Sequence, residues 1–299
     1  METKIPVSTV AGVGEGLRTG DYGRVRRNIV DEVEPIRPGK VPHKSNSDIL
    51  DMHPSGNEEA WAVKGVLHEL TVDLVRRLPE ILEFEGEITS DKCIEILEGA
   101  VDGTGRRSPE IRNGLADLER NHGIEPQNLP GYEIQSYGEP VLTVEEAIEQ
   151  VGEYAGKYFE EVENFGAVET EESIFGNGMS GRMDAVWRGE SDRIVEIKTG
   201  SPSTYDRLQA SAYWLMHGDD PEVVIEYPLE DERLVYTPNT EAEKQDFDIR
   251  QEAAEVNRYR DETLEYIQRL KSLQEQRIKS MDSRKDATRK ALEDLEVPR

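Results

Sequence analysis

The sequence contains a single cysteine, Cys93, among 299 residues. One thiol cannot build a disulfide framework, a Cys-ligated zinc site or a Cys-held iron–sulfur cluster. Long apolar runs are also missing, since no stretch approaches the roughly 18–20 residues of a membrane span. The opening residues, METKIPVSTV, lack the basic start and apolar core of a signal peptide. We therefore expect a cytoplasmic protein without a membrane partner.

Positive charge is scarce, because 36 Lys and Arg face 63 Asp and Glu and leave a net charge of -27. Among the cations, 24 are Arg and 12 are Lys. Self-repulsion at this charge destabilises a compact state in dilute buffer. Salt at about 1 M shortens the Debye length to about 3 Å and screens that repulsion. The composition favours a cytoplasm of high ionic strength, as in a salt-loving archaeon or its virus; an acidic mesophilic protein is the alternative.

The chain divides into three parts by composition. Residues 1–55 are rich in Gly and Pro with few periodic apolar positions, so we expect poor order there. Residues 56–240 carry the periodic patterns of a folded domain, and residues 241–299 are helical in character and highly charged. The apolar positions of this last part keep heptad-like spacing only briefly, so a helix on its own domain is favoured over a protein partner.

Helical signals come first in the middle part. Apolar residues spaced three and four apart predict a helix that begins at Glu58 and ends at Pro79. Further helices are expected from Ser90, from Pro109, and from Thr143, where a capping box opens a helix to about residue 163.

Strand signals follow. Period-2 patterns and turn residues predict strands over 167–175, 181–187, 193–198, 221–227 and 233–236, with a helix from Ser203 or Thr204 to His217. The predicted fold class is α/β, with a central mixed β-sheet flanked by helices and a long C-terminal helix.

Three charged side chains meet within this pattern. Asp184 lies mid-strand, and Glu196 and Lys198 lie on the next strand, joined to the first by a short turn. Side chains alternate faces along a strand, so Glu196 and Lys198 share one face and Asp184 can lie across from Glu196. Two close carboxylates repel unless a cation intervenes, and such oxygen ligands suit Mg²⁺ or Mn²⁺. Metal-assisted phosphodiester hydrolysis is the chemistry that follows.

A solvated salt-bridge ladder on a strand face is the plain alternative. The neighbouring residues favour the metal site. Gly181 permits a close backbone approach before the Asp184 strand. The helix after the second strand carries Gln209 and Tyr213, four residues apart and hence on one face.

These residues resemble a known family. The motifs GRMDAVW, IVEIKTG and QASAY are similar to those of the PD-(D/E)XK nuclease superfamily, within its RecB-like and CRISPR-associated exonuclease branch. That branch also places a histidine on an upstream helix, where this chain has His68. The resemblance covers about residues 165–230 and the surroundings of His68. It implies a restriction-endonuclease-like core with a helical insertion at about 89–163.

The resemblance also implies a role for each matching residue. The metal ligands would be His68, Asp184, Glu196 and the carbonyl of Ile197, with Lys198 catalytic and Gln209 and Tyr213 supporting the site or contacting DNA. An additional acid would be Glu171 or Glu172. Some relatives hold an iron–sulfur cluster with four cysteines, which this chain cannot do alone.

The expected function is a metal-dependent DNA nuclease, an exonuclease acting on single strands or frayed ends in replication, recombination or repair. A catalytically silent nucleic-acid-binding or scaffold protein is the alternative. The Gly-rich turn between two insertion helices carries Arg106 and Arg107. We expect the insertion to roof the cleft and these two side chains to contact phosphates.

Overall fold

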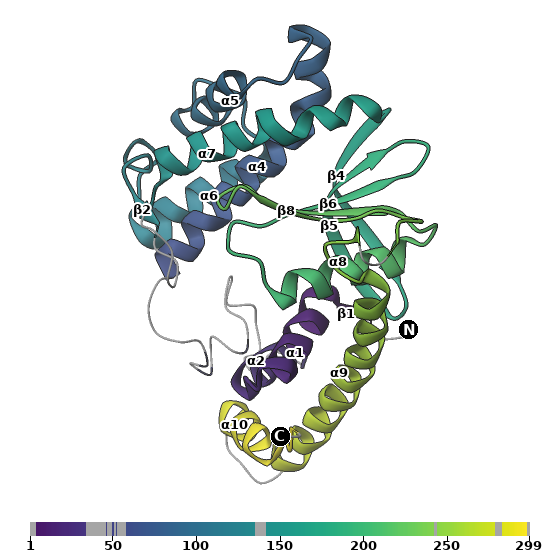
Figure 1. The fold of residues 1–299 in the computed structure, drawn as a ribbon. Coiled ribbons are helices and arrows are strands. Elements are labelled where there is room, and N and C mark those ends of the chain that lie inside the picture. The colour runs from purple at the N-terminus through teal and green to yellow at the C-terminus, as the bar shows by residue number, and fades with distance from the viewer. Residues whose placement is uncertain are drawn as a thin grey trace.

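The computed structural model describes residues 4–33, 46, 50, 52, 58–134, 142–241, 244–278 and 283–297. A mixed β-sheet lies between two layers of helices (Figure 1). Its strands are β1 (Ile5–Pro6), β4 (Ala167–Gly176), β5 (Met179–Arg188), β6 (Arg193–Ile197), β7 (Glu222–Tyr227) and β8 (Glu232–Tyr236). The predicted α/β class with a mixed sheet is therefore confirmed.

The strand order follows the chain closely. β4, β5 and β6 form an antiparallel meander, β6 pairs in parallel with β7, and β8 closes the edge antiparallel to β7. The parallel step requires a crossover, which α8 (Thr204–His217) supplies. β1 pairs in parallel with the start of β5. A separate two-stranded sheet joins β2 (Glu133–Ile134) to β3 (Leu142–Thr143).

Each face of the sheet has its own helical layer and its own core (Figure 1). One layer holds α4 (Glu58–Glu85), α5 (Ser90–Asp102), α6 (Pro109–Asp117), α7 (Val144–Tyr158) and the short helices η1 (Leu118–His122), η2 (Pro126–Asn128) and η3 (Phe159–Asn164). The other holds α1 (Val7–Thr19), α2 (Tyr22–Asp31), α8, α9 (Ile249–Ile278) and α10 (Arg284–Asp294). We call the core on the α4–α7 side of the sheet the first core and the core on the α1, α8 and α9 side the second core. Along β6, Ile194 packs into the second core, and Val195 and Ile197 pack into the first.

Local capping signals fix several helix starts as predicted. Thr143 and Glu146 form the expected capping box before α7. Ser108 caps α6 with Pro109 behind it. Of the two predicted caps for α8, Ser203 takes the role, in a second capping box with Asp206. Each pair satisfies backbone N–H groups that a helix start otherwise leaves without partners.

The predicted end of the first long helix is wrong. α4 continues through Pro79 to Glu85. Proline removes one backbone hydrogen bond from a helix interior. Here Leu78 and Ile81, on either side of that residue, are both buried in the core, and this packing offsets the lost bond.

The expectation of poor order over residues 1–55 is wrong for residues 4–33. These residues form β1, α1 and α2, and Val10, Val13 and Ile29 are buried in the core. The glycines of α1 serve close helix packing: a Cβ on Gly14 would lie 2.5 Å from the Tyr259 ring of α9. Three basic residues of this segment, Arg24, Arg26 and Arg27, lie on α2. Much of the rest of this segment lies outside the described residues.

The predicted insertion and extension are both helical, and both belong to the cores. Tyr154 of α7 and Phe159 of η3 share the first core with Trp187 of β5. Val256 and Leu270 of α9 share the second core with the sheet and α1. The apolar positions of the long C-terminal helix therefore pack within the chain. In the described ranges, no helix is both long enough and apolar enough to cross a membrane.

Candidate active site

The two carboxylates lie across from each other on β5 and β6. The register pairs Ala185 with Val195, so Asp184 and Glu196 are the next residues of the two strands. The Asp184 backbone N–H donates to Glu196 Oε1 at 3.3 Å, and the Ile197 N–H donates to Asp184 Oδ2 at 2.8 Å. Asp184 therefore lies across from Glu196, as strand alternation predicted.

Lys198 follows β6 and turns its ammonium group toward both strands and α8. Its Nζ lies 3.0 Å from Glu196 Oε2 and 3.1 Å from Gln209 Oε1. Glu196 is fully buried, whereas 16% of the Lys198 side chain is exposed. The lysine therefore lies where a buried carboxylate meets solvent.

Two residues of α8, Gln209 and Tyr213, support Lys198 through a chain of hydrogen bonds. Gln209 Nε2 donates to the Tyr213 hydroxyl at 3.2 Å, and that hydroxyl donates to the Arg182 carbonyl at 2.9 Å. A Cβ on Gly181 would lie 2.5 Å from the Tyr213 ring, so only glycine lets α8 approach β5 this closely. Gln209 and Tyr213 thus act as one hydrogen-bonded support for Lys198.

His68 reaches the same point from α4. Its Nε2 lies 3.3 Å from Asp184 Oδ1. The histidine is 116 residues from Asp184 in sequence, and packing of α4 on the sheet brings them together. The structure therefore gathers His68, Asp184, Glu196, Lys198 and Gln209 into one connected site.

The carboxylates have opposite pKa shifts. Burial raises the pKa of Glu196 to about 7, and the nearby charge of Asp184 adds to the rise. Burial also acts to raise the pKa of Asp184, but His68 and Lys198 outweigh it, so this pKa lies below its ordinary value. Two close carboxylates with unequal proton affinity need additional positive charge to be ionised together.

The cations of the site are held charged. Burial acts to lower the pKa of Lys198, but the charges of Glu196 and Asp184 outweigh it and raise the pKa above its ordinary value. The pKa of His68 is raised in the same way, by Asp184 against burial. A charged Lys198 can donate hydrogen bonds and stabilise negative charge.

The side chains of His68, Asp184 and Glu196 are suitable ligands for a divalent cation, although their polar atoms contact one another or neighbouring groups in this structure. Among the described residues, no group of three His, Cys, Asp or Glu side chains is arranged to hold a metal ion. Asp184 Oδ1 and His68 Nε2 face each other, and Glu196 Oε1 accepts only a long bond from the Asp184 amide. Carboxylate oxygens with imidazole nitrogen are suitable ligands for Mn²⁺ and, through the oxygens, Mg²⁺.

Glu171, not Glu172, lies on the site side of β4. Its neighbours Thr170 and Glu172 pair with Ala185 and Met183, which places Glu171 opposite Asp184. Its backbone has a φ of 57°, in the left-handed region. The Glu172 carboxylate instead binds Arg188, near the far end of β5.

Sequence reasoning missed two charged residues near the site, Glu69 and Arg182, and Arg76 lies there as well. Glu69 is half-buried beside His68, and burial raises its pKa. Arg182 Nη1 lies 3.0 Å from Glu171 Oε1, and Arg76 Nη2 lies 3.8 Å from Glu171 Oε2. Glu69 adjoins His68 in sequence and Arg182 precedes Asp184 by two, so proximity to a motif was the available signal.

The two predicted phosphate-binding arginines differ. Arg106 is exposed, with Nη1 3.7 Å from Glu80 Oε2. Arg107 donates to the carbonyls of Ala100 and Val101 at the end of α5. Arg107 therefore does not project freely from the turn, because its guanidinium group satisfies helix-end carbonyls.

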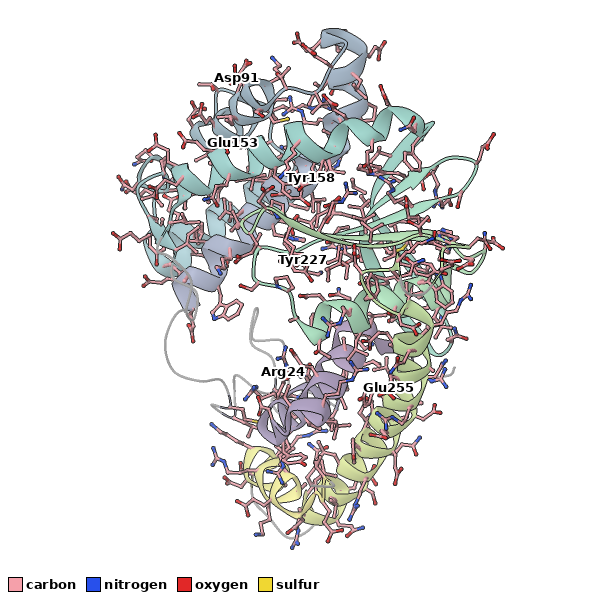
Figure 2. All side chains as sticks on the ribbon, in the orientation of Figure 1. Arg24, Asp91, Glu153, Tyr158, Tyr227 and Glu255 are labelled. Carbon is pink, nitrogen blue, oxygen red and sulfur yellow. The ribbon has the colours of Figure 1, made fainter. Side chains whose placement is uncertain are left out.

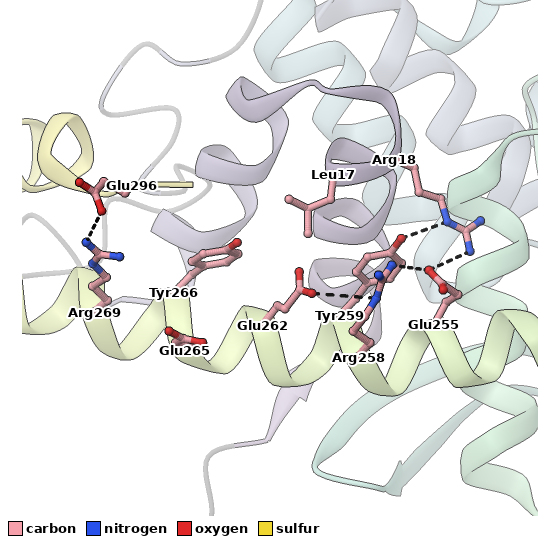
Figure 3. A pocket seen from close by; sticks show the side chains of 10 residues that line it. All are labelled: Leu17, Arg18, Glu255, Arg258, Tyr259, Glu262, Glu265, Tyr266, Arg269 and Glu296. Carbon is pink, nitrogen blue, oxygen red and sulfur yellow. Dashed lines mark hydrogen bonds and ion pairs between the residues drawn. The ribbon is translucent and has the colours of Figure 1, made fainter. Parts of the chain in front are cut away.

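A cavity of about 560 Å³ lies elsewhere, between α1, α9 and the residues after α10 (Figure 3). Arg18 of α1 donates to the Tyr259 hydroxyl, and Arg269 pairs with Glu296. Predicted site residues are absent from its lining. Its mixed charges join the C-terminal helices to α1.

Comparisons with known proteins leave the family open. The chain matches no protein-family model, and a search of curated proteins finds no significant relative.

Proposed function

We propose that this protein is a metal-dependent DNA nuclease, an exonuclease that hydrolyses phosphodiester bonds of single-stranded or frayed DNA. The observation that carries the proposal is the contact network in which Glu196 accepts from both the Asp184 backbone N–H and the Lys198 ammonium group. The mixed sheet flanked by helices agrees with the restriction-endonuclease-like core that the resemblance to PD-(D/E)XK nucleases implies. Replication, recombination or repair in a cytoplasm of high ionic strength is the setting we propose.

Each residue has a separate part. His68, Asp184, Glu196 and the Ile197 carbonyl would hold Mg²⁺ or Mn²⁺, which polarises the phosphate and lowers the pKa of water. Lys198 donates hydrogen bonds to the attacking water or a phosphate oxygen and stabilises the developing negative charge. Gln209 fixes the Lys198 ammonium, and Tyr213 fixes Gln209.

The test uses labelled linear, circular and single-stranded DNA with Mg²⁺ or Mn²⁺ at molar salt. We expect the parent to shorten linear and single-stranded substrates, and Asp184→Asn and Glu196→Gln to lose activity by orders of magnitude. Asp91→Asn is the matched control, because Asp91 is exposed on α5 far from the sheet (Figure 2). Full activity in either site variant would refute the assignment.

A catalytically silent nucleic-acid-binding protein is the second candidate. The ion pair between His68 and Asp184 favours it, because the pair uses two of the proposed metal-ligand atoms. Calorimetric titration with Mn²⁺ separates the candidates: a nuclease site binds the cation and loses it in Asp184→Asn. A silent protein binds DNA and gives no cleavage with either metal.

A further inference from the structure

Trp61 is a large apolar side chain left in solvent. It lies in the first turn of α4 and is 70% exposed. The other two tryptophans are placed differently: Trp187 is fully buried, and Trp214 packs against the second core and donates to Asp220. Single exposed apolar side chains are common on protein surfaces, so the exposure of Trp61 gains meaning from what lies beside it on α4.

The position of Trp61 on α4 connects it to the candidate active site. His68 is seven residues further along, two turns on the same face and about 10.5 Å along the axis at 1.5 Å per residue. The opposite face of the helix, with Val63, Leu67 and Leu70, is buried in the core. The exposed stripe that begins at Trp61 therefore ends at the ion pair of His68 with Asp184.

Gly65 leaves the space between them open. It lies on the same stripe and is exposed, and no atom of the described residues lies within 4 Å of a Cβ built there. A side chain at this position would stand between the indole ring and His68. Glycine weakens a helix interior, so close passage of a ligand is a physical reason for it here.

The acids in the first turn of α4 favour bases over phosphates as the groups contacted there, and Lys64, the cation three residues after Trp61, is buried. Glu58 and Glu59 occupy the same helical turn as Trp61, and Glu59 accepts a hydrogen bond from Tyr132. These acids disfavour phosphates, which are the main contacts of duplex binding. Stacking of a base on an aromatic ring does not depend on charge and survives at molar salt, where phosphate contacts weaken.

We propose that Trp61 is a stacking platform for a base of a single strand whose backbone passes over Gly65 to the candidate active site. This proposal rests on the proposed function in its choice of ligand and adds a substrate-binding residue to it. Arg182, which is 59% exposed and pairs with Glu171 opposite Asp184, is available to meet a phosphate of the same strand. The distance from Trp61 to His68 corresponds to about three base steps of roughly 3.4 Å.

The experiment measures binding separately from cleavage. A fluorescein-labelled single strand of about 12 nucleotides, within the usual site size, is titrated by anisotropy in EDTA at low and molar salt. Trp61→Ala should weaken binding about 5- to 100-fold, from about 1–3 kcal/mol per stacked base at about 1.4 kcal/mol per tenfold. Trp61→Phe should retain most of the affinity, and Gly65→Leu should lose it without loss of stability.

Phe84→Ala is the matched control, because Phe84 is 75% exposed near the other end of α4. We expect it to bind as the parent does. An abasic strand should not distinguish Trp61→Ala from the parent, because it offers no ring to stack. Equal binding by Trp61→Ala and the parent, or no binding by the parent, overturns the proposal. A change of oligomeric state in Trp61→Ala without a change in strand affinity assigns the ring to a protein contact and also overturns it.

Failure of the two proposals can be told apart. A parent that binds the strand through Trp61 but cleaves nothing with Mg²⁺ or Mn²⁺ refutes the nuclease and leaves the platform. A parent that cleaves, with a Trp61→Ala variant that binds and cleaves equally well, refutes the platform alone.

Discussion

At the scale of single residues, Lys198 carries the sharpest chemical assignment. Its ammonium contacts both the Glu196 carboxylate and the Gln209 carbonyl oxygen, so its position is fixed from two sides. Salt-bridge ladders on solvated strand faces have neither the burial of Glu196 nor a third partner from a helix. Such a fixed charge is suited to a reaction in which negative charge develops at a phosphate.

Replacing Lys198 tests that assignment. We expect Lys198→Ala to slow hydrolysis by orders of magnitude, because charge stabilisation and water positioning are lost. Arg should rescue poorly, since its charge is planar and spread over three nitrogens. Single-turnover cleavage gives the rate, and Mn²⁺ titration should show metal binding retained. Near-normal turnover in Lys198→Ala would show that the lysine is only a structural ion-pair partner.

At the scale of elements, the α1–α9 contact depends on a glycine. A Cβ on Gly14 would lie 2.5 Å from the ring of Tyr259 and 2.9 Å from Leu208. Both neighbours are buried, so neither has room to give way. We expect Gly14→Ala to lower the free energy of unfolding by about 1–3 kcal/mol, as overpacking does.

Gly65→Ala is the control for that substitution, because open space surrounds Gly65. Alanine there should stabilise α4 by about 0.5–1 kcal/mol through helix propensity. Denaturant unfolding of both variants gives the comparison. If Gly14→Ala proves as stable as the parent, the close packing of α1 on α9 is wrong.

The turn between α5 and α6 carries two arginines, Arg106 and Arg107, for which we predict different effects of substitution. Arg107→Ala leaves two carbonyls at the end of α5 without their donors and should cost about 1–3 kcal/mol of stability. Arg106→Ala should leave stability unchanged and flatten the salt slope of DNA binding by up to about 0.7–0.9, one phosphate contact. Thermal melts and salt-series binding measure the two effects. An unchanged slope in Arg106→Ala gives this turn no part in DNA binding.

At the scale of the whole molecule, the net charge of -27 governs stability. Acids outnumber bases on a surface that also carries exposed ion pairs such as Lys157–Asp231. Salt weakens those pairs, which contribute little each, but it also screens the repulsion summed over the chain. Repulsion is the larger effect at this imbalance.

We therefore expect the melting temperature to rise from low salt to about 1 M, where the Debye length is about 3 Å. KCl and NaCl should act alike if screening is the cause. Calorimetric or circular-dichroism melts across the series measure it. Equal or greater stability at low salt would contradict the high-salt interpretation and favour an ordinary acidic protein.

The sequence by itself determined what depends on near neighbours. Period-2 alternation and a short turn set Asp184 opposite Glu196 and put Lys198 on the same face. Helices α6, α7 and α8 begin where the patterns predicted. In each, a Ser or Thr side-chain oxygen accepts a hydrogen bond from the backbone N–H three residues later. These features depend on backbone geometry within a few residues, so they are readable from the chain alone.

The tertiary structure alone decided what depends on contacts between distant residues. It ordered residues 4–33 by packing α1 on α9 at Gly14, carried α4 through Pro79, and joined Arg107 to α5. It also chose Glu171 over Glu172 and brought His68 to Asp184. Local propensity is worth less than about 1 kcal/mol per residue for most residues, so burial in a shared core overrides it wherever the two disagree.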